Sequence, residues 1–263
     1  MKTLQNLHIG ARFADKARPN VILRVAGRDL PGYPGTIGVT DNIIKQGCFD
    51  ARERENPNRN RANWGNNHYA PSNARQWLNA DGKDWYKPQH DHDAPPIADN
   101  TYDGDNPYAK DPGFLTEFSE AFKAALTEAT IRTRVPMSED IEETHDKVWL
   151  MSATEVGFDE DGKVGVFFPL FDDFRMKIAA PNDEAVETAS YQPGNFNPTE
   201  GWPYWLRSPY AAYSRSVRLV YTDGSETYDN AAYGYYGLRP ALLLKSEISV
   251  SDEPDERGVY IIG

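Results

Sequence analysis

Two acidic segments, one of which also contains histidines, are the first places in this 263-residue chain where residue type suggests chemistry. His90-Asp91-His92-Asp93 and Asp103-Gly104-Asp105-Asn106 carry the nitrogen and oxygen donors that zinc and calcium prefer. Neither has the full ligand spacing of a known metal loop, since the second lacks a glutamate at the EF-hand position. We interpret both as solvated acidic loops and predict no cofactor, while a loop-bound calcium ion stays open.

The sequence lacks the motifs that accompany nucleophilic catalysis. The five histidines fall in loop-like segments, and neither a Gly-x-Ser-x-Gly turn nor a phosphate-binding glycine loop occurs. The single cysteine, Cys48, excludes an intrachain disulfide and a cysteine-cluster metal site. Because it precedes the aromatic Phe49, we expect it to be a small buried apolar residue. The sequence therefore favours a protein that is not an enzyme.

Tyrosines gather near the carboxyl end of the chain. Eight of the fifteen lie between residues 203 and 240: Tyr204, Tyr210, Tyr213, Tyr221, Tyr228, Tyr233, Tyr235 and Tyr236. In a core, each hydroxyl would need a buried partner. With about 75 Å² of each ring exposed, the eight would form a patch on the order of 600 Å², as large as a typical monomer carries. Tyrosine among Ser, Gly, Asn and Ala is typical of binding loops, so we favour a binding surface over a structural aromatic cluster.

Fixed motifs between these tyrosines resemble those of a known family. Residues 204–209 (YWLRSP), 222–225 (TDGS) and 237–242 (GLRPAL) resemble the C-terminal part of variable proteins of diversity-generating retroelements. Residues 72–79 and 148–157 are similar to an uncharacterised lectin-like domain, so the resemblance spans about residues 5 to 245. It implies an α+β, C-type-lectin-like fold over a single domain, residues 1–263. This fold has a twisted, mainly antiparallel sheet with two main flanking helices and long loops.

The resemblance also implies which residues bind a ligand. In that family, error-prone reverse transcription changes adenines of a template, so that asparagine codons become codons for Tyr, Ser, Asp, Ala, Gly and others. The residues of the variable region, about 204–237, that fit this rule are Tyr210, Ala212, Tyr213, Arg215, Ser216, Leu219, Tyr221, Tyr228, Asp229, Asn230, Ala232, Tyr233, Gly234, Tyr235 and Tyr236. Residues such as Leu206, Val217 and Gly237 would form the constant scaffold.

The expected partner follows from the resemblance and from the charge. The resemblance implies recognition of a protein or glycan ligand on a target cell, by a phage tail protein or a protein displayed through a partner. A formal charge of −12 and a pI near 4.9 argue against nucleic acid or an anionic membrane surface. The sequence contains no run of about 18 apolar residues, so we expect no membrane insertion. Residues 1–6 lack the apolar core of a signal peptide. A homo-oligomer stays open.

Two alternatives remain beside this hypothesis. The first is a lectin-like structural or interaction module that is not diversified. The second is an enzyme related to the formylglycine-generating enzymes, which share the lectin-like fold. Those enzymes act through cysteine, and the single Cys48 lies far upstream of the corresponding region.

Local patterns predict the elements that carry these residues. Residues 21–27 predict a strand, the Gly and Pro residues between 30 and 38 predict turns, and Ser72 or Asn73 caps a helix that ends near Gly82. An apolar stripe over Phe114–Ala129 predicts a helix. Alternation over residues 130–135 and an apolar run over 148–152 predict strands, the latter followed by one helical turn over 153–157.

The carboxyl-terminal part has a hairpin signature. Residues 217–221 and 238–244 predict strands, Asp223-Gly224 predicts a tight turn, and residues 181–203 predict a loop. Arg207, Arg218 and Arg239 stand inside the constant motifs. We expect them to be partly buried and hydrogen-bonded to carbonyls or carboxylates, with exposed salt bridges as the alternative.

Overall fold

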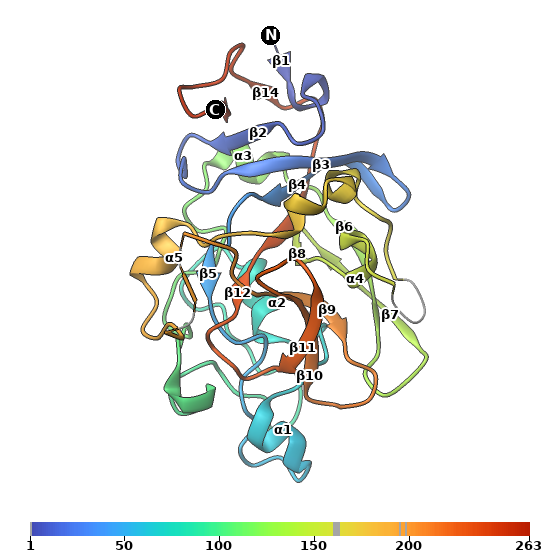
Figure 1. Cartoon of the computed structure of the whole chain (residues 1–263), viewed down its shortest axis with the longest axis vertical. Helices are drawn as coiled ribbons and strands as arrows, with labels where there is room; N and C mark the ends of the chain where they lie inside the picture. The colour runs from blue at the N-terminus through green and yellow to red at the C-terminus, as the bar shows by residue number, and fades with distance from the viewer. Residues whose placement is uncertain (1, 160–163, 195, 198) are drawn as a thin grey trace.

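An eight-stranded sheet forms the upper part of the molecule in the computed structural model, which describes residues 2–159, 164–194, 196, 197 and 199–263 (Figure 1). Its neighbours run β1-β14-β15-β2-β3-β4-β13-β8, and all pairs are antiparallel except β15 with β2. The strands are β1 (Lys2–Thr3), β2 (Arg12–Asp15), β3 (Leu23–Leu30), β4 (Tyr33–Thr40), β8 (Val148–Leu150), β13 (Pro240–Leu244), β14 (Ser249–Val250) and β15 (Val259–Ile262).

A five-stranded sheet carries the tyrosine-rich segment. Its order is β11-β10-β9-β12-β5, with β9 and β12 parallel. The strands are β5 (Lys45–Gln46), β9 (Tyr204–Pro209), β10 (Ser216–Val220), β11 (Glu226–Asn230) and β12 (Gly237–Leu238). A separate ribbon pairs β6 (Ala129–Arg134) with β7 (Ile141–Asp146). In Figure 1 the β10–β11 hairpin lies in the lower half, and both termini lie at the top.

Helices are short and few. They are α1 (Arg59–Trp64), α2 (Asn73–Leu78), α3 (Glu120–Ala125), α4 (Ala153–Val156) and α5 (Asp183–Glu187), with 3-10 turns η1 (Leu4–Asn6), η2 (Tyr102–Gly104), η3 (Pro169–Asp172) and η4 (Phe174–Lys177). Among the described residues, strand accounts for 28% and helix, 3-10 turns included, for 16%. The prediction of an α+β, C-type-lectin-like fold with two main flanking helices is therefore wrong, because the structure is mostly β with large antiparallel sheets.

The predicted helix over Phe114–Ala129 shortens to α3. Ser119 ends the preceding segment because its amide and hydroxyl donate to the carboxylate of Asp15, at 2.7 and 2.6 Å. Its hydroxyl also accepts the amide of Phe122 and so caps α3. Beyond α3, the amide of Thr127 donates to the carbonyl of Leu243 in β13, at 2.9 Å. Contacts with the neighbouring sheet at Ser119 and Thr127 thus replace helical hydrogen bonds on both sides of α3.

The predicted turns over residues 30–38 are mostly strand β4. Only the short connection between Leu30 and Tyr33 turns. Gly35 and Gly38 belong to the strand, where a Cβ at Gly35 would clash with the carbonyl oxygen of Leu244 and one at Gly38 would lie 2.9 Å from the ring of Phe13. These glycines let neighbouring groups approach closely, which composition alone cannot distinguish from a turn.

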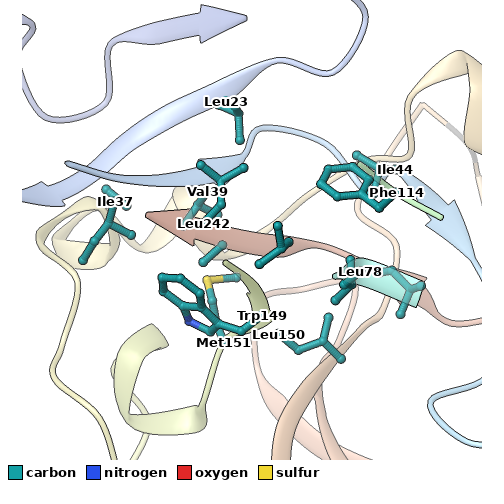
Figure 2. Packing of buried hydrophobic residues seen from close by; sticks show 14 of the residues in the cluster. Leu23, Ile37, Val39, Ile44, Leu78, Phe114, Trp149, Leu150, Met151 and Leu242 are labelled. Carbon is teal, nitrogen blue, oxygen red and sulfur yellow. The ribbon is translucent and has the colours of Figure 1, made fainter. Parts of the chain in front are cut away.

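Several local predictions are confirmed. Ser72 caps α2 and accepts the amide of Arg75, β6 and β8 form, and Gly157 ends α4 in a left-handed conformation. The predicted loop at 181–203 contains α5, capped by Asn182. The core is built from both sheets and α2. Figure 2 shows its centre, where Leu23 and Val39 of β3 and β4 approach Leu242 of β13 and Trp149 of β8, all fully buried.

Candidate ligand-binding surface

The β10–β11 hairpin carries one part of the candidate surface. Its register runs from Ser216 opposite Asn230 to Val220 opposite Glu226. The predicted Asp223-Gly224 turn is confirmed, because the amide of Ser225 donates to the carboxylate of Asp223 and Gly224 adopts φ +82°. Val217 and Val220 are fully buried and anchor the hairpin to the core.

Three tyrosines form a cluster on and beside this hairpin, here called the hairpin cluster: Tyr210, Tyr213 and Tyr228. The rings of Tyr210 and Tyr228 stack with centroids 3.7 Å apart, and Tyr213 lies 5.8 Å from Tyr210. Tyr213 and Tyr228 are 44% and 43% exposed. Two arginines cover rings of this cluster: Arg215 lies 4.9 Å from the ring of Tyr213, and Arg218 lies 5.8 Å from that of Tyr210.

A second group of tyrosines lines a cleft of about 410 Å³. We call it the tyrosine cleft and define it by the residues Tyr102, Asp103, Asp105, Tyr191, Tyr221, Tyr233, Tyr235 and Tyr236, with Pro193 and Phe196 at its wall. Four of its tyrosines come from the predicted variable region. The other two, Tyr102 of η2 and Tyr191 after α5, come from segments far away in the sequence.

Rings in the tyrosine cleft contact each other in both stacked and steeply inclined arrangements. Tyr233 meets Tyr102 edge to face with centroids 4.7 Å apart and stacks on Tyr235 at 5.3 Å. Tyr235 also contacts Tyr191 at 6.1 Å and Tyr236 at 4.7 Å. Such edge-to-face pairs hold aromatic rings in defined orientations. The cleft is therefore a preformed aromatic pocket.

Buried asparagines hold the backbone beneath both groups of tyrosines. Asn106 donates through Nδ2 to the carbonyls of Tyr191 and Gly234, both at 2.9 Å, and accepts the amides of Ser190 and Tyr191. It thereby joins two walls of the tyrosine cleft. Asn67 donates to the carbonyls of Tyr213 and Ser216, at 2.8 and 2.9 Å. Sequence reasoning missed both, because a buried Asn and a loop Asn look alike in sequence.

Carboxylates give this surface its electrostatic character. The hydroxyl of Tyr236 donates to Asp229 at 2.6 Å. Burial raises the pKa of Asp229, and burial together with the nearby Asp229 raises the pKa of Tyr236. Asp103 and Asp105 lie at the cleft itself, where burial and the neighbouring Asp103 raise the pKa of Asp105. The tyrosine cleft is thus an acidic aromatic pocket.

Comparison with known proteins gives one match. The family model described as "Domain of unknown function (DUF6273)" matches residues 35–246, which include both groups of tyrosines. The chain belongs to the DUF6273 family. No curated protein and no solved structure matches it.

The predicted ligand-binding residues of this DUF6273 domain separate into three groups by exposure. Exposed are Ala212, Tyr213, Tyr221 and Tyr228; half-buried are Tyr210, Arg215, Asp229, Asn230, Tyr233 and Tyr235; buried are Ser216, Leu219, Ala232, Gly234 and Tyr236. Tyr236, 7% exposed, still lines the tyrosine cleft.

Four of the buried residues cannot be surface contacts in this structure. The side chain of Leu219 is fully buried in the core, and Ser216 and Ala232 are also buried. A Cβ at Gly234 would clash with the carbonyl oxygen of Asp105. Their codons fit the adenine rule, but burial corrects the prediction that they face a ligand.

Two of the three motif arginines are buried in the DUF6273 frame. Arg207 is fully buried and forms a bidentate pair with the equally buried Glu155, at 2.6 and 2.7 Å. Burial lowers the pKa of the Arg207 guanidinium, but the carboxylate of Glu155 raises it more, and the net shift is upward. Arg239 donates to the carbonyl of Thr40 at 3.0 Å. The third, Arg218, is half-buried and pairs with Glu226 across the hairpin.

The candidate metal ligands and Cys48 are the remaining residues that the sequence singled out. His90 approaches Glu53 at 3.6 Å, and within residues 2–159, 164–194, 196, 197 and 199–263 no three His, Cys, Asp or Glu side chains gather as metal ligands. Cys48 is fully buried, as expected, and burial raises the pKa of its thiol. A protonated, inaccessible thiol is unsuited to the cysteine chemistry of the enzyme alternative.

Proposed function

We propose that this DUF6273 protein binds a protein or glycan ligand on a target cell surface through the tyrosine cleft and the hairpin cluster. We further propose that residues of segment 204–237 are varied by a diversity-generating retroelement. Binding, and not catalysis, is the proposed activity. In the described part of the chain, no helix combines the length and apolar character needed to cross a bilayer.

The observation that carries this proposal is how the tyrosines are supported. Asn106 and Asn67 bind backbone groups of the tyrosine-bearing segments, and the hairpin is held by its register and by buried Val217 and Val220. None of these contacts requires a particular side chain at Tyr213, Tyr221 or Tyr228. Exposed tyrosines on such a frame can change without loss of the fold, which is the property that a diversified binding surface needs.

Burial sets a limit on the proposed variation. Leu219 fills the core and Gly234 has no room for a side chain, so substitution there damages the frame. We therefore expect variation at exposed and half-buried positions, such as Ala212, Tyr213 and Tyr228, and constancy at Leu219 and Gly234.

Sequencing the coding DNA and its flanks in a natural population tests this proposal. The expected result is a nearby near-copy of the segment that differs at adenines, with amino-acid changes concentrated at the exposed positions of 204–237. A segment as constant as β3 and β4, without a near-copy, would refute diversification and leave a constant binding module. Frequent change at Leu219 and Gly234 would contradict the structural limit.

A further inference from the structure

We propose that the tyrosine cleft binds an organic ammonium group, such as that of a lysine side chain or of choline. This inference rests on the proposed function, because it names the chemical class of ligand for one part of the same surface. It is argued from the rings, from the charges at the cleft and from a contrast with the hairpin cluster.

Aromatic walls suit an ammonium ion. The faces of tyrosine rings attract cations within about 6 Å of the ring centroid, most strongly where water is excluded. Tyr233 is edge to face with Tyr102, and Tyr191 is steeply inclined to Tyr235, so the rings are not all parallel. A cleft of about 410 Å³ is large enough for a trimethylammonium group or the end of a lysine side chain.

Charges at the tyrosine cleft favour the same ligand. Its lining includes the carboxylates of Asp103 and Asp105 but neither lysine nor arginine. Within the described ranges, neither carboxylate forms a salt bridge. Arg52 is a cation close to this side, 5.9 Å from the ring of Tyr102; it interacts electrostatically with Asp103, and its guanidinium donates to the carbonyls of Asp99 and Thr101. The cleft therefore has negative charge that an incoming cation would neutralise.

The hairpin cluster shows what three rings of the tyrosine cleft, those of Tyr191, Tyr233 and Tyr235, lack. In that cluster Arg215 covers Tyr213, and Arg218 covers Tyr210. Its rings already have cations from this chain, and Glu226 neutralises Arg218. The rings of the tyrosine cleft at Tyr191, Tyr233 and Tyr235 have no such partner in its lining. The ammonium of a ligand would take the place that the arginines occupy in the hairpin cluster.

Two pairs of probes, each a cation and a neutral counterpart, test the proposal in ligand-observed NMR titrations of the full chain. Choline is compared with 3,3-dimethyl-1-butanol, in which carbon replaces the charged nitrogen. N-acetyl-lysine amide is compared with N-acetyl-norleucine amide, which lacks the ammonium group. We expect each cation to bind about tenfold or more tightly than its neutral counterpart, and added salt to reduce that preference. Preference for choline alone indicates a free small cation, and preference for the lysine amide indicates a protein side chain.

Variants place the binding at the tyrosine cleft. Asp105→Asn keeps the shape of the side chain, and Tyr191→Leu removes a 44% exposed ring while keeping apolar bulk. Both should weaken cation binding severalfold, while Asp91→Asn and Phe174→Leu, the latter at a 53% exposed ring outside the cleft, should not. Thermal unfolding of each variant shows that the fold is intact.

Equal affinity for cation and neutral counterpart, absence of binding by both cations, or equal effects of cleft and control variants would overturn the ammonium site. The proposed function has a separate test. If the population data show diversification while choline and its isostere bind alike, only the inference about ligand class fails. If cation preference is found in a constant segment, the ammonium site stands and diversification fails.

Discussion

Replacing Asn106 by alanine should loosen the connection between the two walls of the tyrosine cleft. Its side chain is 4% exposed and bonds four backbone groups: the carbonyls of Tyr191 and Gly234 and the amides of Ser190 and Tyr191. A typical hydrogen bond contributes about 0.5–1.5 kcal/mol net, so four bonds give about 2–6 kcal/mol. Because water can reach some of these groups after truncation, we expect a loss of about 2–4 kcal/mol.

Urea unfolding followed by tryptophan fluorescence measures this loss, and Asn100→Ala is the matched control. The Asn100 side chain donates one hydrogen bond, to the carbonyl of Pro95 at 3.1 Å, so its loss should cost about 1 kcal/mol or less. Hydrogen exchange should also accelerate at the amides of Ser190 and Tyr191 in Asn106→Ala. If Asn106→Ala costs no more than Asn100→Ala and exchange is unchanged, the reasoning that Asn106 holds the cleft together is refuted.

Three further predictions concern the frame. Glu155→Gln leaves the buried guanidinium of Arg207 without a counter-charge and should lower the free energy of unfolding by about 3–5 kcal/mol. Adding Arg207→Met should recover part of this loss in urea unfolding. Strict additivity of the two changes would contradict a coupled pair. Burial raises the pKa of Asp50 in the folded state, so folding favours the protonated carboxyl. The resulting contribution to stability is fully present below the pKa of the unfolded state, near 4, and is lost as the pH rises through the pKa of the folded state. The stability of Asp50→Asn relative to the natural protein should therefore increase from about pH 4 to pH 8, and a pH-independent difference would oppose this account. Gly234→Ala should lower the free energy of unfolding by about 1–3 kcal/mol because the new Cβ would clash with the carbonyl of Asp105. Unchanged thermal stability would contradict this prediction and show that the backbone at Asp105 can move to accept a side chain.

The predictable parts of the structure depend on local sequence. The Asp223-Gly224 turn and the Ser72 cap involve residues within a few positions of each other, so residue type alone indicates them. Arg207 was predictable as a bonded residue inside a motif predicted to be constant, although its partner Glu155 was not, since 52 positions separate them.

Long-range packing accounts for most of what was missed. The apolar stripe over Phe114–Ala129 has helical spacing, yet Asp15 and Leu243, both distant in sequence, bind the residues on either side of α3 and leave only α3 as helix. Likewise, Tyr102 and Tyr191 join the tyrosine cleft from outside the predicted variable region. Their contribution depends on tertiary contacts such as those of Asn106, for which no pattern in one sequence gives a signal.

Binding to intact cells tests the central claim, that exposed tyrosines on this frame contact a ligand, most directly. The chain is coupled to fluorescent beads through a tag at either terminus, because both termini lie at the end of the molecule away from the β10–β11 hairpin (Figure 1). Beads are then counted on a panel of bacterial cells. The account predicts that Tyr213→Ser and Tyr191→Ser reduce bead binding about tenfold or more, as truncation of contact aromatics does, while the exposed control Asp91→Asn leaves it unchanged. Full bead binding by both tyrosine variants, with their folds intact, would contradict the claim.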